Sequence, residues 1–196
     1  MPPATRKFDR AYYDRYYRDA RTRVATRRAF ERLGGFVAGY LEYLEIRVRT
    51  VLDLGCGVGH WKPVVRHRFP GARYTGVEVS RYLCREYGWE RGSVAAWTGP
   101  PADLVICHGV LQYLRARDAR RAIRNLRRLT AGALYLEVLT REDWDHNVDR
   151  DITDGDVYLR PAAFYRKELA RGFVGCGGGI FLPKTTDVVL YELERT

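Results

Sequence analysis

The stretch Val51-Leu-Asp-Leu-Gly-Cys-Gly-Val-Gly-His-Trp61 decides the fold of this chain. A buried hydrophobic strand ends at Asp53, and glycines follow in a G-x-G-x-G pattern before a helix begins. Because glycine has no Cβ, such a turn lets a ligand lie against bare backbone. The N–H groups at the start of the following helix can bind a carboxylate or a phosphate. The turn therefore predicts a ligand site, and its neighbours must decide which ligand it holds.

Length and composition predict one globular domain. The chain has 196 residues, of which 46% are hydrophobic, enough for a substantial core. No apolar run approaches membrane-spanning length, and the first residues lack the apolar stretch of a signal peptide. The four cysteines are far apart and have no C-x-x-C spacing, which favours reduced thiols in a cytoplasmic protein. The His and acidic residues lack metal-ligand spacing, so no metal is expected.

The net charge of +10 raises the question of nucleic-acid binding. Arginines make up 30 of the 34 basic residues, a bias typical of GC-rich genomes. Much of the excess lies in residues 115–128, where arginines alternate with an apolar stripe in the pattern of an amphipathic helix with a solvated face. We expect nucleic acid to be an unlikely partner, although docking through this arginine-rich helix stays open as an alternative.

The order of predicted elements indicates a doubly wound α/β fold. Residues 9–31 and 33–46 are expected to form N-terminal helices. Apolar strands then alternate with helices, which is typical of a mostly parallel sheet with helices on both faces. The predicted strands are 50–54, 74–78, 92–95, 103–108 and 133–139, and the predicted helices are 60–68, 80–87 (with Ser80 as N-cap), 118–129 and 161–171. Residues 172–182 and 187–194 are expected to close the seven-stranded sheet as an antiparallel hairpin.

The residues at the strand ends narrow the choice of ligand, because ligands of open α/β sheets bind there. Glu78 ends the second strand, nineteen residues after Gly59, where a carboxylate can bond both hydroxyls of a ribose. The nicotinamide fingerprint requires a further glycine where this chain has His60. The missing glycine and the closing hairpin both argue against a dehydrogenase.

At this point the sequence resembles the class I S-adenosylmethionine-dependent methyltransferases. Four stretches carry the resemblance in the family's order: 51–59 (VLDLGCGVG), 74–80 (YTGVEVS), 103–114 (DLVICHGVLQYL) and 132–138 (GALYLEV). The resemblance covers about residues 48–140 and implies S-adenosylmethionine as the cofactor, with S-adenosylhomocysteine as the product. It also implies a Rossmann-like fold with an N-terminal helical lid.

The resemblance further implies which residues contact the cofactor. The glycine turn would approach the methionine moiety, Glu78 would bind the ribose, and residues 107–109 would pass beneath the sulfonium. A tyrosine of the N-terminal helix, Tyr12, Tyr13 or Tyr16, would close over the methionine end. The predicted cofactor residues are Tyr13, Tyr16, Asp53, Gly55, Cys56, Gly57, Gly59, Glu78, Val79, Ser93, Val94, Cys107, His108 and Gly109. For Ser93 and Val94, ordinary strand packing is an equal alternative, and helix packing is an equal alternative for the tyrosines.

The acceptor is sought in residues 137–156, which carry eight acids against two arginines in an otherwise basic protein. Loops in such positions commonly carry specificity. An acidic wall favours a cationic or amine substrate, which predicts methylation of an amine or hydroxyl on a small molecule or peptide. His108 or His146 is the predicted base, and Tyr158 is predicted to position the acceptor. Alternatively, His108 is a hydrogen-bonded structural residue and the acids are solvated helix caps.

Two other functions stay open from the sequence. One is an RNA or ribosomal-protein methyltransferase that docks through the arginine-rich helix, and the other is a non-catalytic cofactor-binding or partner protein. We expect a single domain, a monomer or homodimer without membrane association. Its expected parts are an N-terminal helical cap (1–47), a cofactor-binding core (48–140), an acidic substrate loop (141–160) and a terminal helix with hairpin (161–196).

Overall fold

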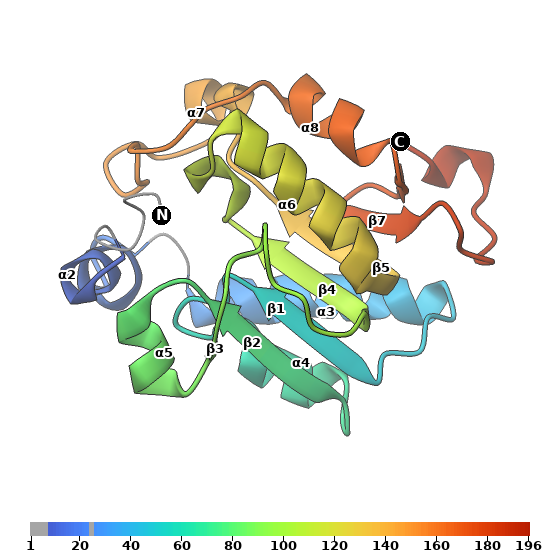
Figure 1. Cartoon of the computed structure of the whole chain (residues 1–196), viewed down its shortest axis with the longest axis horizontal. Coiled ribbons are helices and arrows are strands. Elements are labelled where there is room, and N and C mark those ends of the chain that lie inside the picture. Colours follow the sequence, from blue (N-terminus) through green and yellow to red (C-terminus); the bar gives the residue numbers. More distant parts are fainter. Residues whose placement is uncertain (1–7, 24–25) are drawn as a thin grey trace.

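The computed structural model describes residues 8–23 and 26–196 and contains one seven-stranded sheet (Figure 1). The strand order is β3-β2-β1-β4-β5-β7-β6. The strands are β1 (Thr50–Leu54), β2 (Arg73–Glu78), β3 (Glu90–Arg91), β4 (Ala102–His108), β5 (Thr130–Glu137), β6 (Phe173–Gly175) and β7 (Ile180–Pro183). The first five pair in parallel, while β7 pairs antiparallel with both β5 and β6. The predicted doubly wound, mixed sheet is confirmed.

Helices cover both faces of the sheet (Figure 1). On one face, α3 (Arg27–Tyr43) and α4 (Trp61–Arg68) pack against β1, β4 and β5. On the other, α6 (Ala116–Leu129) and α8 (Ala162–Leu169) do the same. The remaining helical elements are α2 (Arg10–Tyr13), η1 (Asp14–Arg18), α5 (Arg81–Tyr87), η2 (Leu111–Tyr113), α7 (Arg141–His146) and η3 (Glu192–Glu194). Among the described residues, no helix is both long and apolar enough to cross a membrane.

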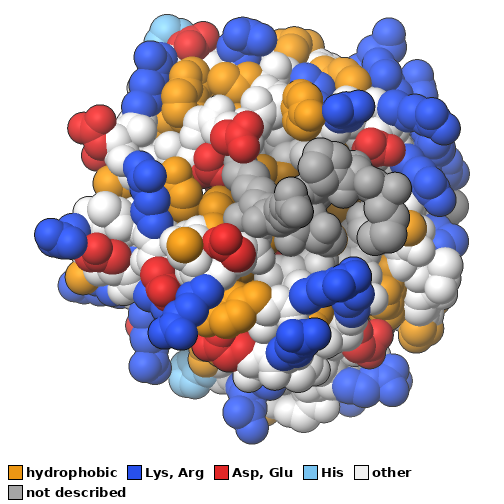
Figure 2. Space-filling view, turned by 60° about the vertical axis from the view of Figure 1, so that its left-hand side comes forward, with side chains coloured by type: hydrophobic (Ala, Val, Ile, Leu, Met, Phe, Trp, Pro, Cys, Tyr) orange, Lys and Arg blue, Asp and Glu red, His pale blue; other side chains and the backbone are white. Residues whose placement is uncertain are grey.

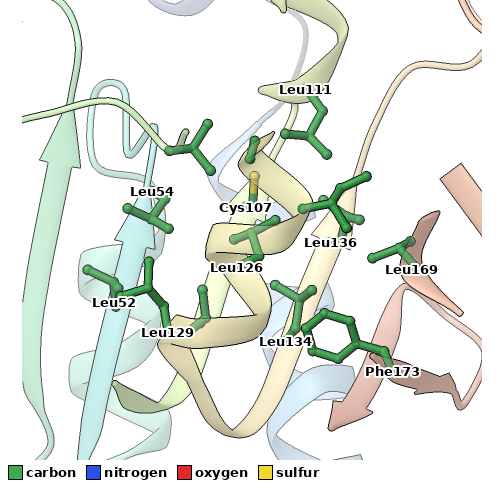
Figure 3. Packing of buried hydrophobic residues seen from close by; sticks show 14 of the residues in the cluster. Leu52, Leu54, Cys107, Leu111, Leu126, Leu129, Leu134, Leu136, Leu169 and Phe173 are labelled. Atoms are coloured by element: carbon green, nitrogen blue, oxygen red, sulfur yellow. The ribbon is translucent and has the colours of Figure 1, made fainter. Parts of the chain in front are cut away.

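The core on the α6 side consists mainly of leucines. Figure 3 shows Leu126 and Leu129 of α6 against Leu52, Leu134 and their neighbours on the strands. The apolar stripe predicted for this helix is fully buried at Leu126 and Leu129, and its arginines face outward. Burial of apolar surface of this kind is the main source of folding free energy.

Local sequence signals set several helix ends as expected. The Ser80 hydroxyl accepts a hydrogen bond from the Leu83 N–H at 3.4 Å and begins α5. Gly88 ends the same helix in the left-handed conformation, with φ at 71°. Thr140 and Asp143 form a capping box at the start of α7.

The N-terminal helix prediction is wrong in its boundaries. In place of one helix over residues 9–31, the chain forms the short α2 and then the π-helix η1, which ends at Arg18. Helix α3 begins at Arg27, where the Thr26 side chain caps it, six residues before the predicted start at residue 33.

Two strand predictions also need correction. Residues 92–95 do not form the third strand, which is the two-residue β3 just before them, because the Ser93 carbonyl accepts from the N–H groups of Ala96 and Trp97 and turns the chain. The hairpin lies earlier than expected: Gly177, Gly178 and Gly179 all have positive φ and split the predicted strand 172–182 into β6 and β7. Residues 187–194 form irregular chain and η3.

Candidate cofactor and acceptor site

The glycine turn after β1 exposes backbone at one position in particular. A Cβ on Gly55 would lie 2.4 Å from Val110 Cγ2, and one on Gly59 would lie 2.7 Å from Trp89 Cζ2. These two glycines are thus required by packing. A Cβ on Gly57 would meet only the Gly55 carbonyl oxygen, at 4.0 Å, and Gly57 lines two adjoining cavities. Gly57 is therefore the glycine whose missing side chain leaves room for a ligand.

Glu78 ends β2 beside this turn, as predicted. Its Oε2 accepts the Gly57 N–H at 2.9 Å, and its Oε1 accepts the N–H groups of Val79 at 2.7 Å and Ser80 at 2.9 Å. Burial raises the pKa of the Glu78 carboxyl, and these backbone donors oppose that rise. A carboxylate held in this way at the end of the second strand suits the hydroxyls of a ribose.

A cavity of about 250 Å³ lies against Glu78, and we call it the inner cavity. Val79, Ser93 and Val94 line it together with Tyr13. An acidic group at one end and apolar walls beyond it fit a nucleoside, and the bare backbone of Gly57 lies at the same cavity. The residues present thus fit the adenosine part of S-adenosylmethionine.

A larger cavity of about 500 Å³, the outer cavity, adjoins the inner one. The two share Tyr12, Tyr17, Gly55, Gly57, His108, Gly109 and Tyr113. Asp53, Cys56 and Tyr16 line the outer cavity, as does part of the acidic segment, namely Glu137, Asp143, Asn147, Val148, Thr153 and Asp154. The predicted substrate segment therefore lies beside the predicted cofactor turn.

Aromatic side chains of α2 and η1 cover the junction of the cavities. The Tyr12 hydroxyl bonds that of Tyr113 at 2.8 Å, and the ring of Phe8 meets both rings edge-on at 5.1 Å. Arg18 ties this segment to α5, bonding the Tyr82 hydroxyl at 2.8 Å and Glu86 at 2.6 Å. The segment thus lies in the position expected of a lid.

Asp53 lies at the floor of the outer cavity and is 1% exposed. The Tyr74 hydroxyl donates to its Oδ2 at 2.5 Å. Burial raises the pKa of Asp53 to about 7, although the Tyr74 bond and the nearby His108 both oppose the rise. The carboxyl therefore changes its ionisation near neutral pH.

His108 is held by hydrogen bonds on both ring nitrogens. Trp61 donates from Nε1 to His108 Nδ1 at 3.2 Å, and His108 Nε2 lies 3.1 Å from Glu137 Oε2. An indole N–H is only a donor, so Nδ1 accepts and the imidazole proton lies on Nε2. The ring of Phe30 lies 5.2 Å from that of His108. The predicted base therefore has the partners of a structural histidine.

The outer cavity carries acidic and aromatic side chains. Among the described residues that line either cavity there is no Lys or Arg. Desolvation raises the pKa of Glu137, but the hydrogen bond and the charge of His108, together with the hydrogen bond from Tyr135, outweigh it and keep the pKa below its usual value. Figure 2 shows acidic side chains among hydrophobic ones near the middle of one face, with many Lys and Arg side chains toward its margin.

Several predicted site residues lie outside both cavities. His146 is exposed at the end of α7, and Tyr158 is 47% exposed with its hydroxyl 3.3 Å from Arg115 Nε. Cys107 is fully buried, and Figure 3 shows its sulfur among the leucines of the α6 side. Gly59 lines neither cavity. The structure therefore places neither His146 nor Tyr158 in the lining of the two cavities.

Other cavity residues escaped the sequence analysis. Tyr17 and Tyr113 close the junction, and Glu137 ends β5 opposite His108 in the parallel register. The position of Glu137 at a strand end is a signal that could have singled it out. His60 stacks on Phe30 with ring centroids 4.6 Å apart, and burial lowers its pKa. In the described part of the chain, no group of three or more His, Cys, Asp or Glu residues could hold a metal ion.

Sequence comparisons match the part of the chain that contains the glycine turn and Glu78. Residues 52–132 match the family described as a methyltransferase domain. A trans-aconitate 2-methyltransferase of Rhodopseudomonas palustris (strain BisB5) is 25% identical over 142 residues, which cover 60% of this chain and 55% of that protein. One from Azoarcus sp. (strain BH72) is 34% identical over 73 residues, or 33% of this chain and 29% of that protein. The chain therefore spans about half or less of the length of these curated relatives.

A comparison of structures extends the similarity over most of the chain. Magnesium protoporphyrin IX methyltransferase (ChlM) from Synechocystis PCC 6803 superposes with a TM-score of 0.63 at 22% identity, covering 88% of this chain and 89% of that one. Identity at this level shows the fold alone. Residues 52–132 therefore form a methyltransferase domain, and the chain as a whole has the fold of the S-adenosylmethionine-dependent methyltransferases that it resembles.

Proposed function

We propose that this protein transfers a methyl group to an amine or hydroxyl of a small molecule or peptide, and that an amine is the preferred acceptor. The observation that supports this proposal most directly is that the two cavities share Gly57, Tyr12 and Tyr113. Glu78 lines the inner cavity and Glu137 lines the outer one. S-adenosylmethionine, when bound, supplies an activated methyl group on a sulfonium. The acceptor then lies in the outer cavity.

The chain's own residues hold the two reactants in two joined cavities. Glu78 and the bare backbone at Gly57 orient the nucleoside end, and the tyrosines of α2 and η1 exclude water at the junction. Holding the two reactants in alignment lowers the activation barrier of a displacement reaction by a large fraction. A displacement of this kind needs no base when the acceptor nitrogen is already neutral.

The charges of the outer cavity favour an amine over a carboxylic acid as the acceptor substrate. The relatives named above methylate trans-aconitate, an anion, whereas the outer cavity has the carboxylates of Glu137, Asp143 and Asp154 and no described Lys or Arg. Burying an unpaired anion next to carboxylates is costly. CalS10, an amino pentose methyltransferase from Micromonospora echinaspora, has the same fold with a TM-score of 0.62 at 16% identity. The amino pentose that CalS10 methylates is an amine-bearing small molecule, which supports the same class of acceptor for this protein.

Transfer of radiolabelled methyl to a panel of acceptors tests the proposal. The panel pairs aminosugars and polyamines with trans-aconitate and citrate, and S-adenosylhomocysteine binding is measured separately by calorimetry. We expect cofactor binding and label on the amines. Label on trans-aconitate alone would refute the amine preference. Cofactor binding without label on any acceptor would favour the non-catalytic alternative.

A further inference from the structure

Glu137 occupies a distinctive place in the outer cavity. It is the last residue of β5, and the parallel register places it opposite His108, the last residue of β4. Its side chain is 56% exposed and lines the outer cavity, which is open to solvent on one side. A carboxylate at this point faces whatever occupies the acceptor space.

Two donors hold one oxygen of this carboxylate. His108 Nε2 lies 3.1 Å from Glu137 Oε2, and the Tyr135 hydroxyl lies 3.3 Å from the same atom. Within the described part of the chain no hydrogen bond is formed to Oε1. A carboxylate fixed at one oxygen presents the other in a defined direction, and charge-assisted hydrogen bonds are the stronger kind.

The hydrogen bond from Trp61 determines which ring nitrogen of His108 donates to Glu137. Because the indole donates to His108 Nδ1 at 3.2 Å, the imidazole must donate from Nε2 toward Glu137. The Nδ1 lone pair is then engaged by Trp61 and Nε2 carries the proton, so neither ring nitrogen is free to accept a proton from the acceptor. His108 therefore acts on the acceptor only through Glu137.

Aromatic rings complete the surroundings of Glu137. The outer cavity is lined by Tyr16, Tyr17, Phe30 and Trp61 in addition to the carboxylates. Aromatic faces attract cations and are neutral toward uncharged groups. The titratable groups that act on Glu137 include His108, Tyr135, Asp143 and Tyr17, and of these only Asp143 is a carboxylic acid.

We propose that Glu137 is the amine-binding group of the acceptor site, with His108 and Trp61 as positioning residues. Its Oε1 contacts the acceptor nitrogen, which enters as an ammonium, loses one proton to water, and attacks as the neutral amine while the sulfonium leaves as a neutral thioether. The inference rests on the proposed function in taking an amine as the acceptor. A nitrogen that has taken a methyl group carries a positive charge, and Glu137 lies where it stabilises that charge.

Three probes of similar shape and different charge test the binding site: benzylammonium, benzyl alcohol and benzoate. Each is titrated by ligand-observed NMR into the full-length protein saturated with S-adenosylhomocysteine. We expect benzylammonium to bind most tightly and Glu137→Gln to weaken its binding about tenfold, which corresponds to about 1.4 kcal/mol for the loss of a charged hydrogen-bond partner. The control Asp151→Asn removes one exposed carboxylate that lines neither cavity and leaves the affinity unchanged.

The positioning role is tested by rescue and by spectroscopy. His108→Leu is expected to weaken benzylammonium binding several-fold, while His108→Gln, whose amide can still donate to Glu137, restores most of it. Nitrogen-15 spectra are expected to show His108 protonated at Nε2 in the native protein and a mixture of tautomers in Trp61→Phe. A merely structural histidine would show no difference between the Leu and Gln variants.

The outcomes separate this inference from the proposed function. If S-adenosylhomocysteine binds but Glu137→Gln leaves the benzylammonium affinity unchanged, the ammonium site is refuted while the cofactor site stands. If benzoate binds as tightly as benzylammonium, the charge argument is also refuted. Failure to bind S-adenosylhomocysteine would instead overturn the proposed function itself.

Discussion

Replacing Gly57 by alanine separates ligand binding from folding in this turn. The residue has φ at 54°, and a Cβ there would meet only one backbone oxygen, at 4.0 Å. The left-handed conformation costs a non-glycine residue about 1–2 kcal/mol. The free energy of unfolding should therefore fall by about that amount, which lowers Tm by about 2–4 °C for each kcal/mol.

The effect on the cofactor should be separate from this cost. The added methyl group would enter the space that the inner and outer cavities share. Overpacking by one methyl costs about 1–3 kcal/mol, which corresponds to about 5- to 150-fold in the Kd of S-adenosylhomocysteine. Calorimetric titration measures the Kd, and thermal unfolding of the same sample measures the stability.

Gly88→Ala is the matched control. Gly88 also has a positive φ, 71°, and a Cβ there meets nothing within 4 Å, but it ends α5 away from both cavities. We expect the same loss of Tm and no loss of affinity. If Gly57→Ala binds S-adenosylhomocysteine as tightly as Gly88→Ala does, then the glycine turn does not hold the cofactor and the reasoning fails.

Three further predictions concern the rest of the molecule. Burial raises the pKa of Asp53 to about 7 in the folded protein, from 3.8 in the unfolded chain. Below the unfolded value the carboxyl is protonated in both states and contributes its full stabilisation. As pH rises from there to 7, the free energy of unfolding falls by about 1.4 kcal/mol per pH unit. Asp53→Asn should lack this dependence in denaturant titrations from pH 5 to 8, and parallel curves would contradict it. Leu126→Ala should lower the free energy of unfolding by about 2–5 kcal/mol in urea, since Leu126 is fully buried, and a loss below 1 kcal/mol would contradict the packing. Arg18→Gln should raise the dissociation rate of S-adenosylhomocysteine several-fold in stopped-flow experiments, because it releases residues 8–18 (the tyrosine segment, which contains α2 and η1) from α5; an unchanged rate would argue against a lid.

The sequence predicted the parts of the molecule that depend on local signals. The strand before the glycine turn, the Ser80 cap and the position of Glu78 all follow from short patterns, and the structure contains each of them. The sequence prediction placed the hairpin too late: it took the apolar run 188–191 as the last strand, whereas the three glycines before Ile180 form the turn. A run of positive-φ glycines is the stronger turn signal, since few other residues adopt that conformation.

The acceptor site was harder to predict because it depends on contacts across the sheet. Trp61, His108 and Glu137 come from three elements, and only the register of β4 and β5 places the last two together. His146 was predicted from its residue type within an acidic segment, but α7 leaves it exposed. Spacing along the chain carries no information on which side of a short helix faces a cavity.

The attachment of the tyrosine segment to α5 provides a reporter of occupancy. Ser80 donates to the Phe8 carbonyl at 2.6 Å while its hydroxyl also caps α5, and Arg18 adds its bonds to the same helix. Arg10 and Arg15 of this segment are exposed, which makes them accessible to trypsin. Cleavage there requires local opening, and a ligand beneath the segment suppresses that opening. The rate of tryptic nicking therefore measures cofactor occupancy before any acceptor has been found.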